Sequence, residues 1–175
     1  MCYEFSESAS VTGTQSLPNM DQPRHSLTLT YHHSNIYAIG GMDQYHKYTR
    51  TVTKFNNQTK RWSKIGDLCH ERANHKSISL KSGLYVIGGY NGQNWLKSIE
   101  RLDESKNIFY HVMELKEERS SFGLIKCVED NGFIVLGGRN YSELDTCEYV
   151  SLKDKSTKYI SSLLCPQSDI FCFRS

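Results

Sequence analysis

The sequence repeats one short pattern three times: an apolar run that ends abruptly on two adjacent glycines. The pattern is IYAIGG at residues 36–41, LYVIGG at 84–89 and FIVLGG at 133–138. The second glycine pair follows the first by 48 residues, and the third follows the second by 49. A fixed period of this length indicates that one supersecondary unit is repeated along the chain, so that each copy packs against its neighbours.

Other residues keep the same period. An arginine precedes the first two glycine pairs by 16 residues and the third by 18, at Arg24, Arg72 and Arg119. Between each arginine and its glycines lie two apolar-rich runs separated by a short polar turn. The two additional residues of the third copy fall in that turn, where Asn131-Gly132 is a strong hairpin signal. Each copy therefore predicts a β-hairpin.

Two further strands are predicted after each glycine pair. A polar loop leads to a third strand, at residues 51–55, 98–102 and 146–150, with equivalent apolar pairs Val52/Phe55, Ile99/Leu102 and Cys147/Val150. We expect a fourth strand to begin on an aromatic residue: Trp62, Tyr110 or Tyr159. Four strands at this period indicate one blade of a β-propeller. Two adjacent glycines allow the apolar strand to leave its sheet by a tight bend beside a neighbouring backbone.

The predicted fold is all-β: a partial propeller of three complete four-stranded blades with partial blades at both ends. The complete units span residues 23–68, 69–115 and 116–163. We interpret residues 1–22 as the outer strand of a preceding unit, and 164–175 as the first strand of a further one, with Gln167 in the arginine's place. Propellers close with about four to eight blades. Three blades would leave apolar faces open, so the sequence is predicted to be a fragment of a longer protein.

The repeated unit resembles the kelch repeat, over nearly the whole chain. The resemblance rests on the double glycine after a hydrophobic-Tyr-x-Ile strand, the spaced aromatic and the preceding arginine. The segments SIERLDESKNIFYHV and LDTCEYVSL are most similar to the animal BTB-kelch group. The resemblance implies a propeller that holds a protein substrate while separate N-terminal domains recruit a cullin ubiquitin ligase. No BTB- or BACK-type region precedes the repeats, so ligase recruitment by these residues is not expected.

Three functions follow from the resemblance. The first hypothesis is substrate recognition in a cullin-type ubiquitin ligase adaptor. The alternative is an actin-binding or cytoskeletal kelch module, and a remote alternative is a metal-dependent kelch oxidase. The first two are protein-binding roles without enzymatic activity. The expected partner is a protein or peptide, and an acidic one is among the options.

The resemblance also implies where such a partner would bind. In the family, the loops after the glycine pairs and the residue after each arginine line the mouth of the central channel. Here these positions are Asp43, Gln44, Tyr45, Tyr90, Asn91, Trp95, Arg139, Asn140 and Tyr141, together with His25, Ala73 and Ser120. Tyr, Trp, Arg and Asn are typical of recognition surfaces. Arg139 is the first candidate, because its guanidinium suits a carboxylate on a peptide.

The strictly repeated residues favour structural roles. We expect the three arginines to tie strands together within or between blades. Structural roles are also expected for the glycine pairs Gly40, Gly41, Gly88, Gly89, Gly137 and Gly138 and for Trp62, whose core position Tyr110 and Tyr159 would fill in the other copies. Trp95 has no counterpart in the other copies, so partner contact and packing on a neighbouring loop both remain open. For Arg139, a solvated loop charge is an equal alternative.

Composition excludes several other classes. A net charge of +2 without a clustered basic face gives no support for nucleic-acid binding. The longest apolar runs have four residues, too few for a membrane span. The N-terminus lacks the features of a signal peptide, and six cysteines at irregular spacings contain no C-x-x-C pair. Reduced thiols and a cytoplasmic location are therefore expected.

Metal and cofactor chemistry is not predicted. Two clusters contain adjacent ligand types, Cys69-His70 with His75 and His32-His33, but neither has a matching second ligand pair at metal spacing. The sequence has no phosphate-binding loop, nucleophile elbow or H-E-x-x-H motif. We therefore expect no metal, no cofactor and no catalytic residues.

Overall fold

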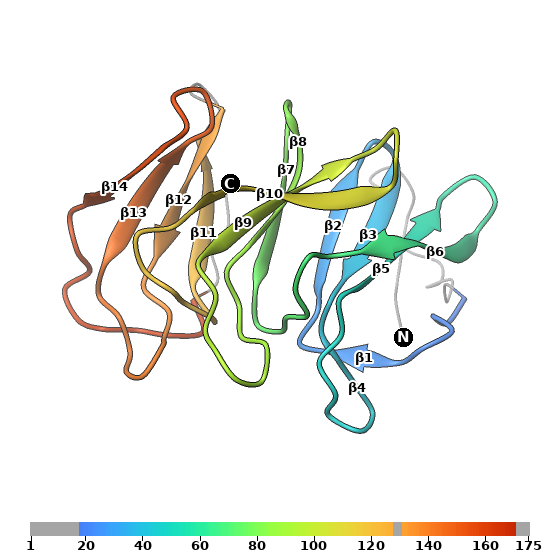
Figure 1. Cartoon of the computed structure of the whole chain (residues 1–175), viewed down its shortest axis with the longest axis horizontal. Coiled ribbons are helices and arrows are strands. Elements are labelled where there is room, and N and C mark those ends of the chain that lie inside the picture. Colours follow the sequence, from blue (N-terminus) through green and yellow to red (C-terminus); the bar gives the residue numbers. More distant parts are fainter. Residues whose placement is uncertain (1–17, 128–130, 171–175) are drawn as a thin grey trace, which may run out of the picture.

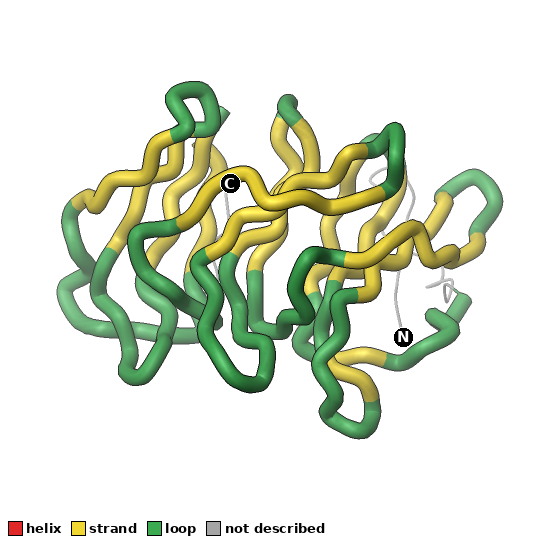
Figure 2. Tube along the Cα trace, in the orientation of Figure 1, coloured by secondary structure: helices red, strands yellow, loops and turns green. Residues whose placement is uncertain are grey.

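All regular structure in the described part of the chain is β (Figures 1 and 2). The computed structural model describes residues 18–127 and 131–170. These residues contain 14 strands, most of them in three four-stranded antiparallel sheets that stand side by side as twisted blades. They contain no helix long and apolar enough to span a bilayer. The predicted all-β fold of four-stranded blades is confirmed.

Within each blade the strands pair in chain order. Blade 1 consists of β2 (Thr28–His32), β3 (Asn35–Ile39), β5 (Thr51–Asn56) and β6 (Arg61–Asp67). Blade 2 consists of β7 (Lys76–Leu80), β8 (Gly83–Ile87), β9 (Ser98–Asp103) and β10 (Ile108–Glu114). Blade 3 consists of β11 (Gly123–Cys127), β12 (Gly132–Leu136), β13 (Cys147–Ser151) and β14 (Ser156–Ile160). Two short strands, β1 (Arg24–His25) and β4 (Met42–Asp43), pair below blade 1 in Figure 1.

The wholly apolar second strands are explained by packing on both faces. In β8, Leu84 and Val86 join a buried cluster with blade 1 residues such as Val52. Tyr85 and Ile87, which point the other way, join a second cluster with blade 3 residues. Each blade junction therefore has its own core, and the middle blade contributes to both.

The glycine pairs connect one repeat to the next. The second glycine of each pair donates its N–H to a carbonyl of the following unit: Gly41 to Arg72 (2.8 Å), Gly89 to Arg119 (2.8 Å) and Gly138 to Gln167 (2.7 Å). These glycines have φ of +95°, +105° and +96°. A Cβ at Gly89 would lie 2.9 Å from the carbonyl oxygen of Ala73. The positive φ and the close backbone approach together require glycine here.

A second set of backbone hydrogen bonds links the starts of successive units. The residues two positions after the arginines and after Gln167 adopt a left-handed conformation, and from Asn74 onward each donates its N–H to the carbonyl of its counterpart in the preceding unit. The bonds are Asn74 to Ser26 (3.0 Å), Ser121 to Asn74 (2.9 Å) and Asp169 to Ser121 (2.7 Å), with φ between 52° and 55° at all four residues. Gln167 and Asp169 therefore reproduce the backbone geometry with which the earlier units begin.

The predicted terminal strands lie largely outside the described residues. Residues 1–17 of the outer strand expected within 1–22 are not among them, nor are residues 171–175 of the last expected strand. The assignment of 1–22 and 164–175 to partial blades therefore stays a prediction.

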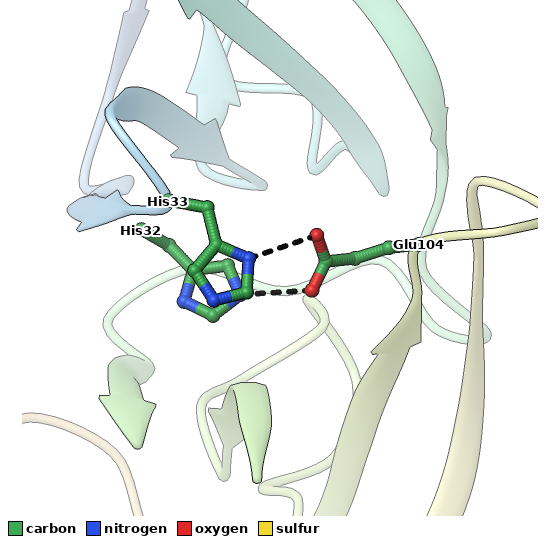
Figure 3. Close-up of side chains that lie close together, drawn as sticks. All are labelled: His32, His33 and Glu104. Atoms are coloured by element: carbon green, nitrogen blue, oxygen red, sulfur yellow. Dashed lines mark hydrogen bonds and ion pairs between the residues drawn. The ribbon is translucent and has the colours of Figure 1, made fainter. Parts of the chain in front are cut away.

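The junction between blades 1 and 2 contains a polar ladder, which we define as three side-chain contacts between β2 and β7. Thr28 Oγ1 lies 3.0 Å from His75 Nε2, Thr30 bonds Ser77, and His32 Nδ1 lies 2.7 Å from Ser79 Oγ. His32 also lies at the β2–β3 turn beside His33 (Figure 3). The corresponding positions between blades 2 and 3 are mostly apolar: Ile78, Leu80, Phe122 and Leu124 pack in one cluster. Lys126, the counterpart of Ser79, donates to the Ser79 carbonyl at 3.0 Å. The two junctions thus share geometry but differ in chemistry.

The predicted position of the outer-strand aromatics is wrong in two blades. Strand pairing places Trp62 opposite Phe55, but it places Phe109 opposite Leu102 and Thr157 opposite Val150. The true counterparts of Trp62 are therefore Phe109, which is buried, and Thr157. Tyr110 and Tyr159 face outward instead, with 38% and 53% of their surface exposed. Trp62 itself is half-buried against the Phe55 ring, with a centroid distance of 5.2 Å.

Replacing Gly89 with alanine should destabilise the chain by about 2–4 kcal/mol, because a Cβ both disfavours the positive φ and overlaps its surroundings. Urea unfolding monitored by circular dichroism measures this change. Gln93→Ala, in the exposed loop that follows, is the matched control and should change stability by less than about 0.5 kcal/mol. Equal stability of the Gly89→Ala variant and the wild type would contradict the proposed junction.

Stability should fall as the pH drops below about 6.5, the unperturbed histidine value. Burial, with help from the nearby Arg72 charge, holds the pKa of His75 well below its usual range. His75 is therefore neutral in the folded chain, and its contribution, complete above pH 6.5, is lost as the pH falls towards the folded pKa. His75→Phe, which copies the blade 3 residue Phe122, should flatten the pH dependence of the unfolding free energy. An unchanged pH profile would contradict this role.

Candidate binding site on the loop face

The loops that follow the three glycine pairs lie at the same edge of the blades, the lower edge in Figure 1; we call this edge the loop face. In each blade, the residue after the arginine forms an antiparallel bridge with the residue after the glycine pair. The bridges are His25–Met42, Ala73–Tyr90 and Ser120–Arg139. Each loop therefore leaves the sheet from an equivalent, backbone-fixed point.

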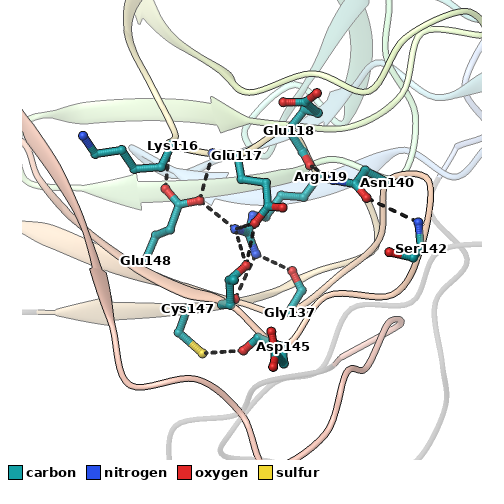
Figure 4. A network of polar contacts seen from close by, with 11 residues as sticks. Lys116, Glu117, Glu118, Arg119, Gly137, Asn140, Ser142, Asp145, Cys147 and Glu148 are labelled. Carbon is teal, nitrogen blue, oxygen red and sulfur yellow. Dashed lines mark hydrogen bonds and ion pairs between the residues drawn. The ribbon is translucent and has the colours of Figure 1, made fainter.

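Buried arginines hold both ends of these loops. Arg119 is inaccessible to solvent, and its Nη1 donates to the carbonyls of Gly137 (2.6 Å) and Thr146 (3.0 Å), where the blade 3 loop begins and ends (Figure 4). Its Nη2 donates to Glu148 at 2.6 Å. Glu148 also accepts backbone N–H groups of Lys116 and Glu117. The ion pair thus joins the loop ends to the linker that enters the blade.

Arg72 in blade 2 and Arg24 in blade 1 bind the loop ends in the same way, but the side-chain acceptor differs in blade 1. Arg72 Nη1 donates to Gly88 O (2.8 Å), and its Nη2 pairs with the buried carboxylate of Glu100. Burial lowers the pKa of Arg72, and Glu100 counteracts that effect. In blade 1, Arg24 donates to Gly40 O (2.9 Å), but Thr53 stands in place of the glutamate and accepts through Oγ1 at 2.7 Å. The hydrogen bonds that the Arg72 and Arg119 side chains donate lie within their own blades and the linkers that enter them.

Three of the predicted binding residues shape the loops. Asp43, Asn91 and Asn140 each stand two positions after a glycine pair. Asp43 Oδ1 accepts the N–H of Tyr45 (2.8 Å), and Asn91 Oδ1 accepts the N–H groups of Gln93 and Asn94 (2.9 and 2.7 Å). Asn140 does the same more weakly, with Ser142 at 3.3 Å. Side chains that accept from the backbone two residues on form a tight turn.

Four aromatic rings form a continuous row across the loop face. Tyr48 meets Tyr90 edge-on at a centroid distance of 5.8 Å, Tyr90 packs on Trp95 at 4.9 Å, and Trp95 packs on Tyr141 at 4.8 Å. We call these four residues the aromatic row. The structure therefore brings together Tyr90, Trp95 and Tyr141, which were predicted separately from three positions in two loops. Tyr48 was missed, although its ring also packs on Gly92 of the next loop.

The aromatic row ends in exposed groups on both sides. Tyr141 is 84% exposed at one end, and the exposed Arg139 stands two residues before it in the same loop. At the other end, Tyr48 lines a pocket of about 370 Å³ together with Asp43, Gln44, Tyr45 and Lys47. Gln44 and Tyr45 are exposed at the tip of this loop. The row thus presents an apolar strip with a basic side chain near each end.

Two predicted contact positions are not accessible. Ser120 is only 3% exposed and Ala73 is fully buried, because each lies in the backbone bridge beneath a loop. The Ser120 hydroxyl contacts the Arg139 carbonyl at 3.4 Å. A direct role of Ser120 in partner binding is therefore corrected to a structural one, whereas His25, which occupies the equivalent place in blade 1, is exposed.

Comparison with protein families gives a direct match. Residues 23–68 and 71–116 match the family model described as Kelch motif. Among curated proteins, the chain is 29% identical over 113 residues to "Kelch-like protein 35" of Mus musculus, covering 65% of this chain and 19% of that protein. It is 26% identical over 133 residues to "Spermatocyte protein spe-26" of Caenorhabditis elegans, covering 71% and 23%. The chain spans about a fifth of the length of these relatives.

A solved structure shows the same architecture. The structure described as "Structure of YjhT" superposes with a TM-score of 0.81 over 95% of this chain and 60% of that chain. Sequence identity is 15%, so the likeness concerns the fold alone. Because 95% of the chain follows one solved propeller, the arrangement of the blades, and not only their internal strands, is that of a propeller.

Removing the carboxylate of Glu100 should destabilise the chain strongly. Glu100→Ala leaves the buried Arg72 charge unpaired, at a cost of about 3–5 kcal/mol. Thr53→Ala, at the equivalent place in blade 1, removes only a neutral acceptor and should cost about 1 kcal/mol. Urea unfolding of both variants gives the comparison. Similar losses in the two variants would show that the ion pair has no special role.

Proposed function

The chain belongs to the kelch-motif family, and from this premise we propose that it is a protein-binding propeller segment without enzymatic activity of its own. Kelch repeats generally bind protein partners. The observation that carries the proposal is the aromatic row, which collects exposed and half-buried rings from the loops of three consecutive blades. A partner that contacts this row touches every described blade at once.

The chemistry of the row suits a peptide or an exposed protein loop. Tyrosine and tryptophan supply a large contact area at low conformational cost, since each has only two side-chain torsions. The loops that carry them are fixed at their ends by buried arginines and internally by Asp43, Asn91 and Asn140. Such preorganisation reduces the entropy lost on binding.

Arg139 gives the proposed partner its charge preference. Arg139 is exposed and stands two residues before Tyr141 in the same loop, so a carboxylate on the partner can bind Arg139 while neighbouring side chains pack on the rings. At the opposite end, Lys47 shares its pocket with Asp21 and Asp43, so Arg139 alone carries the proposed preference. We therefore propose an acidic segment as the preferred partner.

The biological role we propose is substrate recognition in a cullin-type ubiquitin ligase adaptor acting in the cytoplasm. Support comes from the resemblance to the BTB-kelch group and from similarity to a kelch-like protein. The chain covers about a fifth of that relative, so recruitment of a ligase would belong to regions other than these repeats.

The two tryptophans provide a matched test of the binding face. Trp95→Ala should weaken binding to a partner identified by pull-down at least tenfold, since central aromatic anchors typically contribute about 2 kcal/mol or more. Trp62→Ala, on the outer strand of blade 1, should leave the affinity unchanged. Isothermal titration calorimetry with purified partner measures both, after circular dichroism has established that both variants fold. Equal effects of the two substitutions would reject the aromatic row as the site.

The charge preference has a separate test. Arg139→Ala should weaken an acidic peptide from the partner more than a version with its carboxylates replaced by amides. Equal loss for both peptides, or for neither, would reject the role of Arg139. Cosedimentation with actin filaments that depends on Trp95 would assign the same face to a cytoskeletal partner instead.

A further inference from the structure

A second cluster of functional side chains lies at the opposite edge of the blades from the loop face. His32 and His33, at the β2–β3 turn of blade 1, meet Glu104, which begins the β9–β10 turn of blade 2 (Figure 3). His32 Nε2 lies 3.2 Å from one carboxylate oxygen, and His33 Nδ1 lies 3.1 Å from the other. The three ligand atoms lie within 4.8 Å of one another.

The turn conformation places both histidines on the same side. Neighbouring residues of an extended strand point in opposite directions. Here His33 and Ser34 both adopt left-handed conformations, with φ of 45° and 64°, and the two imidazole rings stack at a centroid distance of 4.0 Å. A left-handed conformation is uncommon for histidine and serine. It turns the His33 ring back over His32 and towards blade 2.

The His32 ring is held in place from its other side. Its Nδ1 lies 2.7 Å from the Ser79 hydroxyl, and the Tyr37 ring meets it edge-on at 6.0 Å. His32 is almost completely buried. A polar partner on one ring nitrogen fixes the orientation of a metal-binding histidine and directs the other nitrogen at the ion. In this cluster the nitrogen so directed is Nε2, which faces Glu104.

The next blade junction has leucines where this cluster has His32 and Glu104. Strand pairing makes Leu80 the counterpart of His32, and Leu152 the counterpart of Glu104. Leu80 and Leu152 belong to one apolar cluster between blades 2 and 3. Packing of this junction therefore does not require a histidine or a carboxylate. The presence of His32 and Glu104 where the next junction has leucines therefore needs an explanation other than packing.

We propose that His32 Nε2, His33 Nδ1 and the Glu104 carboxylate bind a divalent transition-metal ion of the Zn²⁺ type, with water as the fourth ligand. Bonds of about 2.0–2.1 Å in a tetrahedron place ligand atoms about 3.3 Å apart. Each imidazole nitrogen lies at about that separation from a different oxygen of the Glu104 carboxylate, so one nitrogen is already well placed whichever oxygen binds the ion. Imidazole and carboxylate are the ligand types that such ions take, and rotation of the side chains brings the second nitrogen to bonding distance.

The ion has a structural task in this arrangement. It joins the hairpin of blade 1 to the hairpin of blade 2, where the polar ladder replaces the apolar contacts of the next junction. Entry from solvent is open, because the His33 and Glu104 side chains are 65% and 43% exposed. An ion that binds only the folded chain stabilises it by mass action. This site is separate from the loop face, so its test does not depend on the proposed partner.

Zinc titration of the full chain, in metal-free buffer with a competing chromophoric chelator, tests the proposal. The wild type should take up one Zn²⁺ per chain and unfold at a higher temperature when Zn²⁺ is present. Glu104→Gln should weaken uptake at least tenfold and abolish the thermal shift. His111→Gln removes a histidine from the exposed His111–Glu114 pair and should change neither.

A second variant separates loss of the ion from loss of the fold. His32→Leu with Glu104→Leu copies the leucine pair of the next junction and should fold without responding to Zn²⁺. No stoichiometric uptake by the wild type, or equal uptake by the wild type and Glu104→Gln, would overturn the proposal. A Zn²⁺ response retained by the double leucine variant would overturn it as well.

Discussion

One backbone hydrogen bond decides how the repeats fit together: the second glycine of each pair donates to the carbonyl at the arginine position of the next unit. Its geometry excludes a Cβ at the donor, and it brings each apolar strand against the start of the following blade. The second set of backbone hydrogen bonds, from Ser26 through Asn74 and Ser121 to Asp169, adds a parallel connection. Because the same bonds recur at each junction, successive blades are joined in the same way although the side chains at their junctions differ.

The three repeated arginines hold the loops of the loop face in fixed positions on this scaffold. Each arginine donates to the same two backbone groups in its blade: the carbonyl of the first glycine and the carbonyl at the end of the loop. Glu100 and Glu148 neutralise two of them, whereas Thr53 serves in the first blade. With both loop ends fixed, the exposed side chains between them can differ from blade to blade. The aromatic row lies on these loops, and the histidine–glutamate cluster lies at the opposite edge of the blades.

The sequence predicts the features that repeat and fails where side chains from different repeats meet. The glycine pairs and arginines reveal the blades because the bonds that they make recur in each unit. Phe109 was missed because Tyr110 and Tyr159 were aligned by their resemblance to Trp62; seven residues counted on from Phe55, Leu102 and Val150 give the observed pairing. Ser120 was assigned to the surface, but the backbone bridge that buries it leaves no trace in one sequence. Glu104 lies 71 residues from His33, so only the packing of blade on blade reveals their contact.

The central claim, that glycine amides bind each unit to the next, is tested most directly by native-state hydrogen exchange at individual residues. The amides of Gly41 and Gly89 and those of Asn74 and Ser121 should exchange as slowly as the central strand β8, because they open only when the blades separate. Exchange of these four amides at the rate of the exposed loop amides, while β8 stays protected, would show that the blades are folded individually and not joined in this way.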